Sequence, residues 1–239
     1  ITGTGEGVSS PEITALDNGN YAIVWSNINN GIDDQMLIKI VDSSGAQVLG
    51  TTIVYDVYQD LGDSSITTLT NGKFAIGFTG DNSGGTNGLV GLVIYNEDGS
   101  KYAGVYFPTT TSAGNQVGTA IAAVDGGGLV VFWFDENTND LHGQRYLSNG
   151  VKLGVEFDVV NFGSTDISNI EAIRMEDGRI AITWTAEFSG GTDGDIQAAI
   201  WDPRDAANSP AVYTSKQIIG TINDDFYNVV AADESVFGY

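Results

Sequence analysis

Four polar loops hold the residues whose types and spacing suit metal binding. They read NINNGIDDQ over residues 27–35, GDNSGGTNG over 80–88, DENTND over 135–140 and SGGTDGD over 189–195. Calcium takes six to eight oxygen ligands, and glycine-rich loops with Asp and Asn can wrap an ion in this way. The loops therefore predict a calcium site, with these candidate ligands: Asp33, Asp34, Asp81, Asp135, Asp140, Asp193 and Asp195.

The same loops have a second interpretation as solvated turns, because Asp, Asn and Gly are the residues that tight turns favour. No EF-hand pattern is present. GGTDGDIQA, over 190–198, matches half of the calcium-binding Gly-Gly-x-Gly-x-Asp repeat, with Asp193 where that repeat requires glycine. Calcium binding and simple turn formation both stay open at this point.

Catalytic chemistry finds little support in residue types. His142 is the single histidine, there is no cysteine, and no Gly-x-Ser-x-Gly elbow exists, so nucleophilic catalysis and zinc chemistry are disfavoured. Among 31 acidic residues some pair will lie at the separation used in glycoside cleavage, but the sequence singles out no pair. The prediction is a protein that is not an enzyme.

Aromatic residues that could stack on sugar rings fall into two groups. Trp25, Trp133 and Trp184 lie on the bulky face of strand-like segments, so we expect them in the core. Trp201, beside an irregular DPRD turn, and Phe188, in a polar loop, are the candidate ligand-binding residues.

The elements that position these residues repeat along the chain. A nine-residue stretch reads DNGNYAIVW at 17–25, TNGKFAIGF at 70–78, DGGGLVVFW at 125–133 and EDGRIAITW at 176–184. Its turn glycines are 53, 55 and 51 residues apart. Strand patterning at such a period is typical of propeller blades.

Each repeat contains two hairpin signals, and therefore four strands. The first is the repeated stretch, and the second has its turn at Ser44-Gly45, Asp98-Gly99 and Asn149-Gly150, with DPRDAANSP over 202–210 in the fourth repeat. We predict an all-β, propeller-like array of four antiparallel repeats of about 53 residues, with an open stack of sheets as the alternative. The predicted single domain, 1–239, comprises repeats at about 8–57, 58–110, 111–161 and 162–221, and a partial fifth repeat or closing strand at 222–239.

One face of the repeated strand is bulky in every repeat, whereas the other is small or medium in three of the four. Tyr21, Ile23 and Trp25 alternate with Ala22 and Val24 in the first copy. Because side chains alternate between the faces of a strand, large faces can pack against small ones when sheets stack. The repetition thus has a packing explanation.

The charge of the chain and its lack of long apolar stretches exclude two classes of binding partner. The 239 residues include 9 Lys and Arg against 31 Asp and Glu, a net charge of −22. Nucleic acids and anionic membranes need basic patches, so neither is an expected partner. No apolar stretch approaches the roughly 18 residues of a membrane span, so we expect no membrane insertion.

GQRYLSNGVKLGVEFDVVN, over 143–161, resembles a tandem repeat of RTX-type (haemolysin-type calcium-binding) bacterial surface and secreted proteins. Only the third repeat keeps the Gln-Arg-aromatic part, at Gln144, Arg145 and Tyr146. The resemblance implies a propeller-like repeat module of an extracellular adhesin or similar large protein, often set beside calcium-binding repeats. We expect a non-catalytic interaction or structural module, with calcium as a stabilising ion. The expected location is extracellular or on the bacterial cell surface.

The expected partners are a cell-surface glycan, a protein or neighbouring copies of the chain. The alternative function is a lectin-like or carbohydrate-active module that binds glycans on the loop face, around the fourth repeat.

Overall fold

A computed structural model describes residues 7–28, 34–57, 59–81, 88–106, 115–161, 166–187, 194–204 and 216–219. Within these ranges the chain forms four antiparallel four-stranded sheets, each built from strands that are consecutive in the sequence. The protein is therefore all-β, with the propeller-like architecture that the repeats predict. The fifth partial repeat expected at 222–239 lies outside the described residues.

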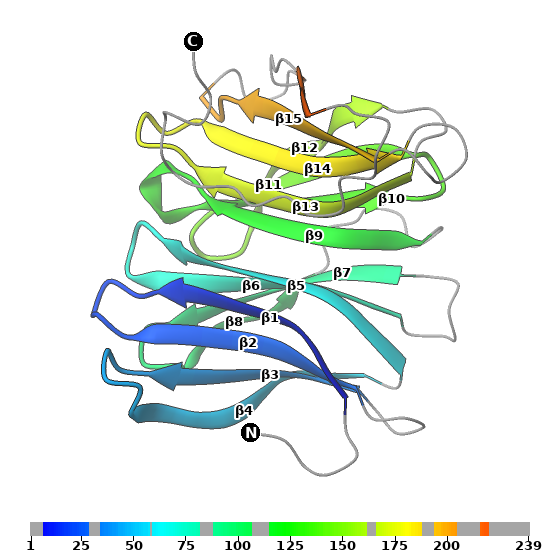
Figure 1. Cartoon of the computed structure of the whole chain (residues 1–239). Helices are drawn as coiled ribbons and strands as arrows, with labels where there is room; N and C mark the ends of the chain where they lie inside the picture. Colours follow the sequence, from blue (N-terminus) through cyan, green and yellow to red (C-terminus); the bar gives the residue numbers. More distant parts are fainter. Residues whose placement is uncertain are drawn as a thin grey trace.

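The sheets follow one another in chain order (Figure 1). The first comprises β1 (Gly7–Ala15), β2 (Tyr21–Ile28), β3 (Asp34–Val41) and β4 (Gln47–Val57). The second comprises β5 (Gln59–Leu69), β6 (Lys73–Asp81), β7 (Gly88–Asn96) and β8 (Lys101–Tyr106). The third comprises β9 (Gln116–Ala123), β10 (Leu129–Asp135), β11 (Asp140–Tyr146) and β12 (Lys152–Asn161), with the short 3-10 turn η1 (Asp125–Gly127) after β9. The fourth comprises β13 (Asp166–Arg174), β14 (Ile180–Glu187), β15 (Gly194–Trp201) and β16 (Lys216–Ile219).

Tight turns join the first two strands of each sheet. Gly19, Gly72 and Gly178 have φ values of +84°, +73° and +87°, a region that side-chain-bearing residues rarely adopt. The Gly19 amide closes its turn by donating to the Leu16 carbonyl at 3.0 Å. The repeated Asn-Gly and Asp-Gly pairs are thus turn chemistry that reverses the chain between paired strands.

The bulky face of each sheet packs on the smaller face of the sheet before it. Phe74, Ile76 and Phe78 of β6 share a buried cluster with Ala22 and Val24 of β2. The same arrangement joins β10 to Ala75 of β6, and β14 to Val130 and Phe132 of β10. The expected large-on-small packing of repeated sheets is confirmed.

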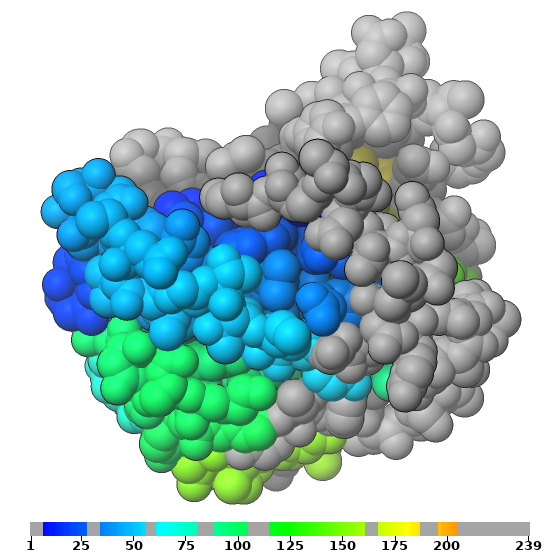
Figure 2. All heavy atoms as spheres, turned by 90° about the horizontal axis from the view of Figure 1, so that it is seen from below, coloured from blue at the N-terminus to red at the C-terminus, as the bar shows by residue number. Residues whose placement is uncertain are grey.

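The core tryptophans expected from the sequence are buried: Trp25, Trp133 and Trp184 are 6%, 1% and 0% exposed. Every residue of β10 is buried as well. On the first sheet, by contrast, Ile13 is 59% and Tyr21 is 38% exposed on the bulky face. Figure 2 shows the sheet colours following one another from blue through green to yellow-green around one side of the molecule.

The first strands β1, β5, β9 and β13 contact one another in series. Hydroxyl groups of β5 connect this series, because each first strand has one edge without a ladder partner. Ser64 donates to the Ser10 carbonyl of β1 at 2.7 Å, and Ser65 accepts from the Ile121 amide of β9 at 3.1 Å.

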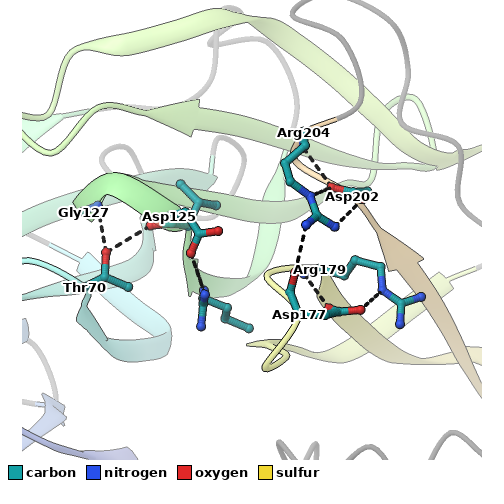
Figure 3. A network of polar contacts seen from close by, with 9 residues as sticks. Thr70, Asp125, Gly127, Asp177, Arg179, Asp202 and Arg204 are labelled. Atoms are coloured by element: carbon teal, nitrogen blue, oxygen red, sulfur yellow. Dashed lines mark hydrogen bonds and ion pairs between the residues drawn. The ribbon is translucent and has the colours of Figure 1, made fainter.

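The hairpin turns of neighbouring sheets are also connected, at the opposite end from the polar loops (Figure 3). Thr70 accepts from the Gly127 amide at 2.8 Å, and Arg174 pairs with Asp125. Arg204 donates to the carbonyl oxygen of Asp177 at 3.0 Å. This network holds one end of the second, third and fourth sheets together.

The described part of the chain contains no helix of the length and apolarity needed to cross a membrane.

Candidate active site

Each first strand carries a β-bulge near its middle. The register shifts between Ser9 and Glu12 in β1, between Leu61 and Ser64 in β5, and between Ser168 and Glu171 in β13. A bulge inserts unpaired residues, bends the strand and re-aims the side chains beside it. In β9 the shift falls at Gly118, whose φ is +60°.

Three carboxylates lie at these bulges. Glu12 and Glu171 come directly after the bulges of β1 and β13, where they lie opposite Val24 and Thr183. Asp63 lies within the bulge of β5, and its amide donates to the hydroxyl of Thr79 at 3.0 Å. The first strands therefore bring carboxylates of three different sheets to one level of the structure.

The three groups share a common electrostatic environment. Burial raises the pKa of Glu12 and of Asp63. Burial also raises the pKa of Glu171 to about 7, with further contributions from the negative charges of Glu12 and Asp63. Glu171 is therefore partly protonated near neutral pH, at which an ordinary carboxyl group is ionised.

The coupling of Glu12 to Glu171 also defines the shape of the array. Packed sheets lie about 10 Å apart, so a straight stack of four would separate the first and fourth sheets by about 30 Å. Charges at that distance are largely screened by salt, because the Debye length is about 8–10 Å. Since Glu12 of β1 raises the pKa of Glu171 of β13, the first strands of the first and fourth sheets lie closer together than a straight stack would place them. This supports the propeller over the open stack.

The three carboxyl groups differ in their exposure to solvent. Asp63 is exposed to solvent, yet surrounding protein raises its pKa. Glu12 and Glu171 are partly buried, so solvent reaches all three groups.

The carboxylates are too widely spread to hold one metal ion. Among the described residues, the one set of three potential ligands within 4.8 Å of one another lies elsewhere. Carboxylates that are coupled but separated leave room between them for a substrate or a water molecule. Because their pKa values differ, one can donate a proton while another accepts one.

The calcium ligands expected from the sequence lie apart from this site and engage the protein itself. The buried Asp34 accepts a hydrogen bond from the Leu61 amide at 3.2 Å. Asp135 accepts from the Asn137 amide at 2.8 Å, which closes the β10–β11 turn. Asp140 is buried on β11, where it pairs across the sheet with Asp135. Calcium binding at these positions stays a prediction.

The other expected site residues have these positions. Trp201 is 4% exposed, and its ring stacks on Phe157 at 4.9 Å and meets Phe132 edge-on at 6.0 Å, so its aromatic surface is occupied inside the core. The backbones of Asp81 and Asp195 lie in β6 and β15, but their side chains are outside the described set. Asp33, Asp193 and Phe188 are outside it altogether.

Sequence reasoning missed Glu12, Asp63 and Glu171. One signal was present, because Glu12 and Glu171 both lie seven residues before the turn glycines Gly19 and Gly178. The same position holds Ser65 and Ala120 in the other two repeats. Comparison of the repeats at that position finds two of the three carboxylates.

No family model matches the chain, and no curated protein is similar to it in sequence. Solved structures of similar fold exist. An α-L-arabinanase of Penicillium chrysogenum, in complex with arabinobiose, is 13% identical with a TM-score of 0.63, covering 90% of this chain and 68% of its own. An endo-arabinase of Bacteroides thetaiotaomicron is 11% identical with a TM-score of 0.57, covering 89% of this chain and 81% of its own. A PL25 ulvan lyase is 11% identical with a TM-score of 0.55, covering 87% of this chain and 57% of its own.

These comparisons correct three expectations. The relationship to RTX-type repeat proteins is wrong, because the structural neighbours are glycoside hydrolases and a polysaccharide lyase. The expected non-catalytic adhesin role and the expectation of no enzyme activity are overturned by the same neighbours.

The motif that suggested RTX proteins has a packing explanation. It spans the β11–β12 hairpin, where Gly143 lies under the ring of Phe157 and the buried Gln144 donates to the Arg145 carbonyl at 2.9 Å. Such a motif reports how two strands of a sheet pack, and not what the protein does.

Proposed function

We propose that this chain is a carbohydrate-active enzyme that cleaves glycosidic bonds at the carboxylates of its first strands. The observation that carries the proposal is the raised pKa of Glu171, caused by burial and by the facing charges of Glu12 and Asp63. Glycoside hydrolysis needs one protonated and one ionised carboxyl group beside the bond to be broken. The similarity in fold to arabinanases and other carbohydrate-active enzymes supports the same class.

Glu171 is the general acid in this proposal. With a pKa of about 7, it donates its proton to the oxygen of the leaving sugar. Glu12 or Asp63 is the second carboxylate, which either activates a water molecule or attacks the sugar directly. The remaining carboxylate keeps the pKa of Glu171 high through its charge.

The charge of the site favours neutral glycans as substrates. The whole chain carries a net charge of −22, and three of its acidic residues lie at the site. This field repels polyanionic polysaccharides and accepts an oxocarbenium-like transition state, which carries positive charge. We therefore propose a neutral polymer such as arabinan as the first substrate class to test. An extracellular location is part of the proposal, since such polymers lie outside cells.

The direct test measures the release of reducing sugars from arabinan and other neutral glycans by wild type and by Glu171→Gln, Glu12→Gln and Asp63→Asn. We expect Glu171→Gln to lower kcat by about 10²–10⁴-fold, the usual contribution of a positioned acid. Glu176→Gln, which removes an exposed charge elsewhere, is the matched control and should retain full activity.

Other outcomes are equally informative. If an anionic polymer gives an unsaturated uronic product, the reaction is a lyase reaction and the proposed hydrolysis is wrong. Saturable glycan binding with no cleavage in wild type would replace catalysis with lectin-like recognition. Equal activity of wild type and Glu171→Gln on a cleaved glycan would remove Glu171 from the mechanism.

A further inference from the structure

A second cluster of polar side chains lies on the third sheet, on β11 and β12. It comprises Asp140, His142 and Asp158, each of which offers one potential ligand atom within 4.8 Å of the others. Asp140 and His142 lie two residues apart on β11, hence on the same face of the strand. His142 pairs across the sheet with Asp158 of β12. The antiparallel ladder therefore holds the three side chains together.

The buried carboxylate of Asp140 lacks a hydrogen-bond partner on Oδ1. Asp140 is 8% exposed, and this oxygen is closed to solvent. A buried carboxylate oxygen without a partner is costly, because it has lost its water and gained nothing in return. A cation between Asp140 and the other two side chains would supply the missing interaction.

The histidine faces the carboxylates with one ring nitrogen. Its Nδ1 lies 2.9 Å from Oδ1 of Asp158 and 3.6 Å from Oε1 of Glu156. The Nδ1 atom is buried and forms no hydrogen bond, although the Asp158 oxygen is within hydrogen-bond distance. A metal ion bound between this nitrogen and the carboxylate oxygens would give Nδ1 a partner.

The surroundings of His142 resemble those of a metal-binding histidine. Its Nε2 lies 3.3 Å from the Thr138 hydroxyl, so an Nε2–H tautomer leaves the lone pair of Nδ1 facing the carboxylates. Metal-bound histidines usually donate their second ring N–H in this way. The ring also stacks on Trp133, with 5.8 Å between the ring centres, which fixes its orientation.

We propose that Asp140, His142 and Asp158 form a binding site for a divalent first-row transition metal ion. One imidazole nitrogen with two carboxylates suits zinc, cobalt or manganese better than calcium, which needs six to eight oxygen ligands. Ligand atoms around one such ion lie about 3–4 Å apart, so small side-chain rotations close the cluster. The side chain of Asp158 is 62% exposed and provides the access route for the ion. Glu156 lies near enough to add a fourth ligand.

The test uses the full chain after treatment with EDTA and buffer exchange, titrated with ZnCl₂ or CoCl₂. We expect one equivalent to bind by calorimetry, cobalt to give visible absorption bands, and the melting temperature to rise with zinc. Asp140→Asn and His142→Gln should each weaken binding at least about tenfold. Glu176→Gln removes a charge elsewhere and should bind like wild type.

Asp158→Asn keeps the test decisive if a variant of a buried residue fails to fold, because Asp158 is largely exposed. It too should lose affinity while its EDTA-treated form melts like wild type. Two results would overturn the proposal: no saturable binding of zinc or cobalt by wild type, or binding that Asp158→Asn leaves unchanged. Binding of calcium in place of zinc and cobalt would also overturn it.

Discussion

At the scale of single residues, the proposed chemistry depends on a carboxyl group that is partly protonated at neutral pH. Glu171 reaches this state because it is partly buried and because Glu12 and Asp63 face it. The three side chains come from different sheets, at positions that the bulges define. Their coupling is therefore a property of the folded array and is lost when the sheets separate.

The pH dependence of catalysis should report this coupling. With the pKa of Glu171 at about 7, we expect kcat/KM to fall as the pH rises above about 7, because the general acid loses its proton. The measurement is a pH–rate profile of the wild type. Asp63→Asn removes one neighbouring charge and should move the alkaline limb to lower pH, if the variant retains measurable activity. A flat profile between pH 6 and about 9 would contradict the role of Glu171.

The same carboxyl group should make the protein less stable at neutral pH than at acidic pH. The folded chain holds the proton of Glu171 to about pH 7, whereas an unfolded chain releases it near the ordinary glutamate pKa of 4.5. Its contribution to stability is thus complete below about pH 4.5 and is lost as the pH rises to about 7. At pH 8 we expect the free energy of unfolding of Glu171→Gln to be about 1–3 kcal/mol higher than that of wild type.

Urea melts at pH 8 and pH 4.5 measure this difference, which should disappear at the lower pH. Glu176→Gln is the control and should match wild type at both values. If Glu171→Gln is less stable than wild type at pH 8, the contacts of the Glu171 side chain stabilise the fold by more than its buried charge destabilises it.

Sequence reasoning at this scale found the turn glycines and the core tryptophans but not the carboxylates. Gly19 and Trp133 belong to local patterns, in which a turn or an alternation is visible within nine residues. Glu12, Asp63 and Glu171 are far apart in the chain, and their meeting depends on the curvature of the whole array. A local sequence pattern does not reveal which residues far apart in the sequence come together in the fold.

At the scale of elements, neighbouring strands make room for large rings with glycine. Gly91 of β7 pairs with Phe78 of β6, and a Cβ at Gly91 would collide with the phenyl ring. Gly143 of β11 has the same relation to Phe157 of β12. These strands are therefore matched as pairs, with an aromatic ring on one strand lying over a glycine on the other.

Gly91→Ala should consequently destabilise the protein by about 1–3 kcal/mol, the usual cost of overpacking a core. Gly104→Ala, in β8 of the same sheet, is the matched control, because nothing lies within 4 Å of its added Cβ. That variant should be neutral or slightly stabilising. Chemical denaturation of both variants measures the difference, and equal stability of the two would show that the ring of Phe78 moves aside freely.

At the scale of the whole molecule, each sheet depends on the one before it. The bulky face of one sheet covers the small face of its predecessor, whereas the first sheet leaves Ile13 and Tyr21 exposed. Arrays of this kind behave as chains of nearest-neighbour contacts, so local opening begins where a neighbour is absent.

Hydrogen exchange should follow this gradient. We expect the amides of β10, whose residues are all buried, to exchange more slowly than those of β1. Mass spectrometry of peptides from the native protein measures both strands in one experiment. Uniform exchange of β1 and β10 would mean that the whole array opens as a single unit.

Most of the architecture could be predicted from the sequence, and little of the function. The nine-residue repeat, its glycine turns and its alternating faces are local and appear four times, which is enough to define four-stranded sheets. The β11–β12 motif pointed to the wrong class of protein because it records strand packing, which proteins of unrelated function share.

The bulge on each first strand also has a consequence for how such a protein can change over time. One position on the first strand is equivalent in all four sheets, because its cross-strand partner is the equivalent residue of the second strand each time. The residues at this position are Glu12, Ser65, Ala120 and Glu171. The same position therefore occurs once in each of the four sheets, and a carboxylate occupies it in two of them. A substitution at the partly buried Ser65 can introduce a new functional group at this position, whereas Ala120 lies in a buried apolar cluster that would have to repack. The repetition that builds the scaffold is therefore also a source of new chemistry.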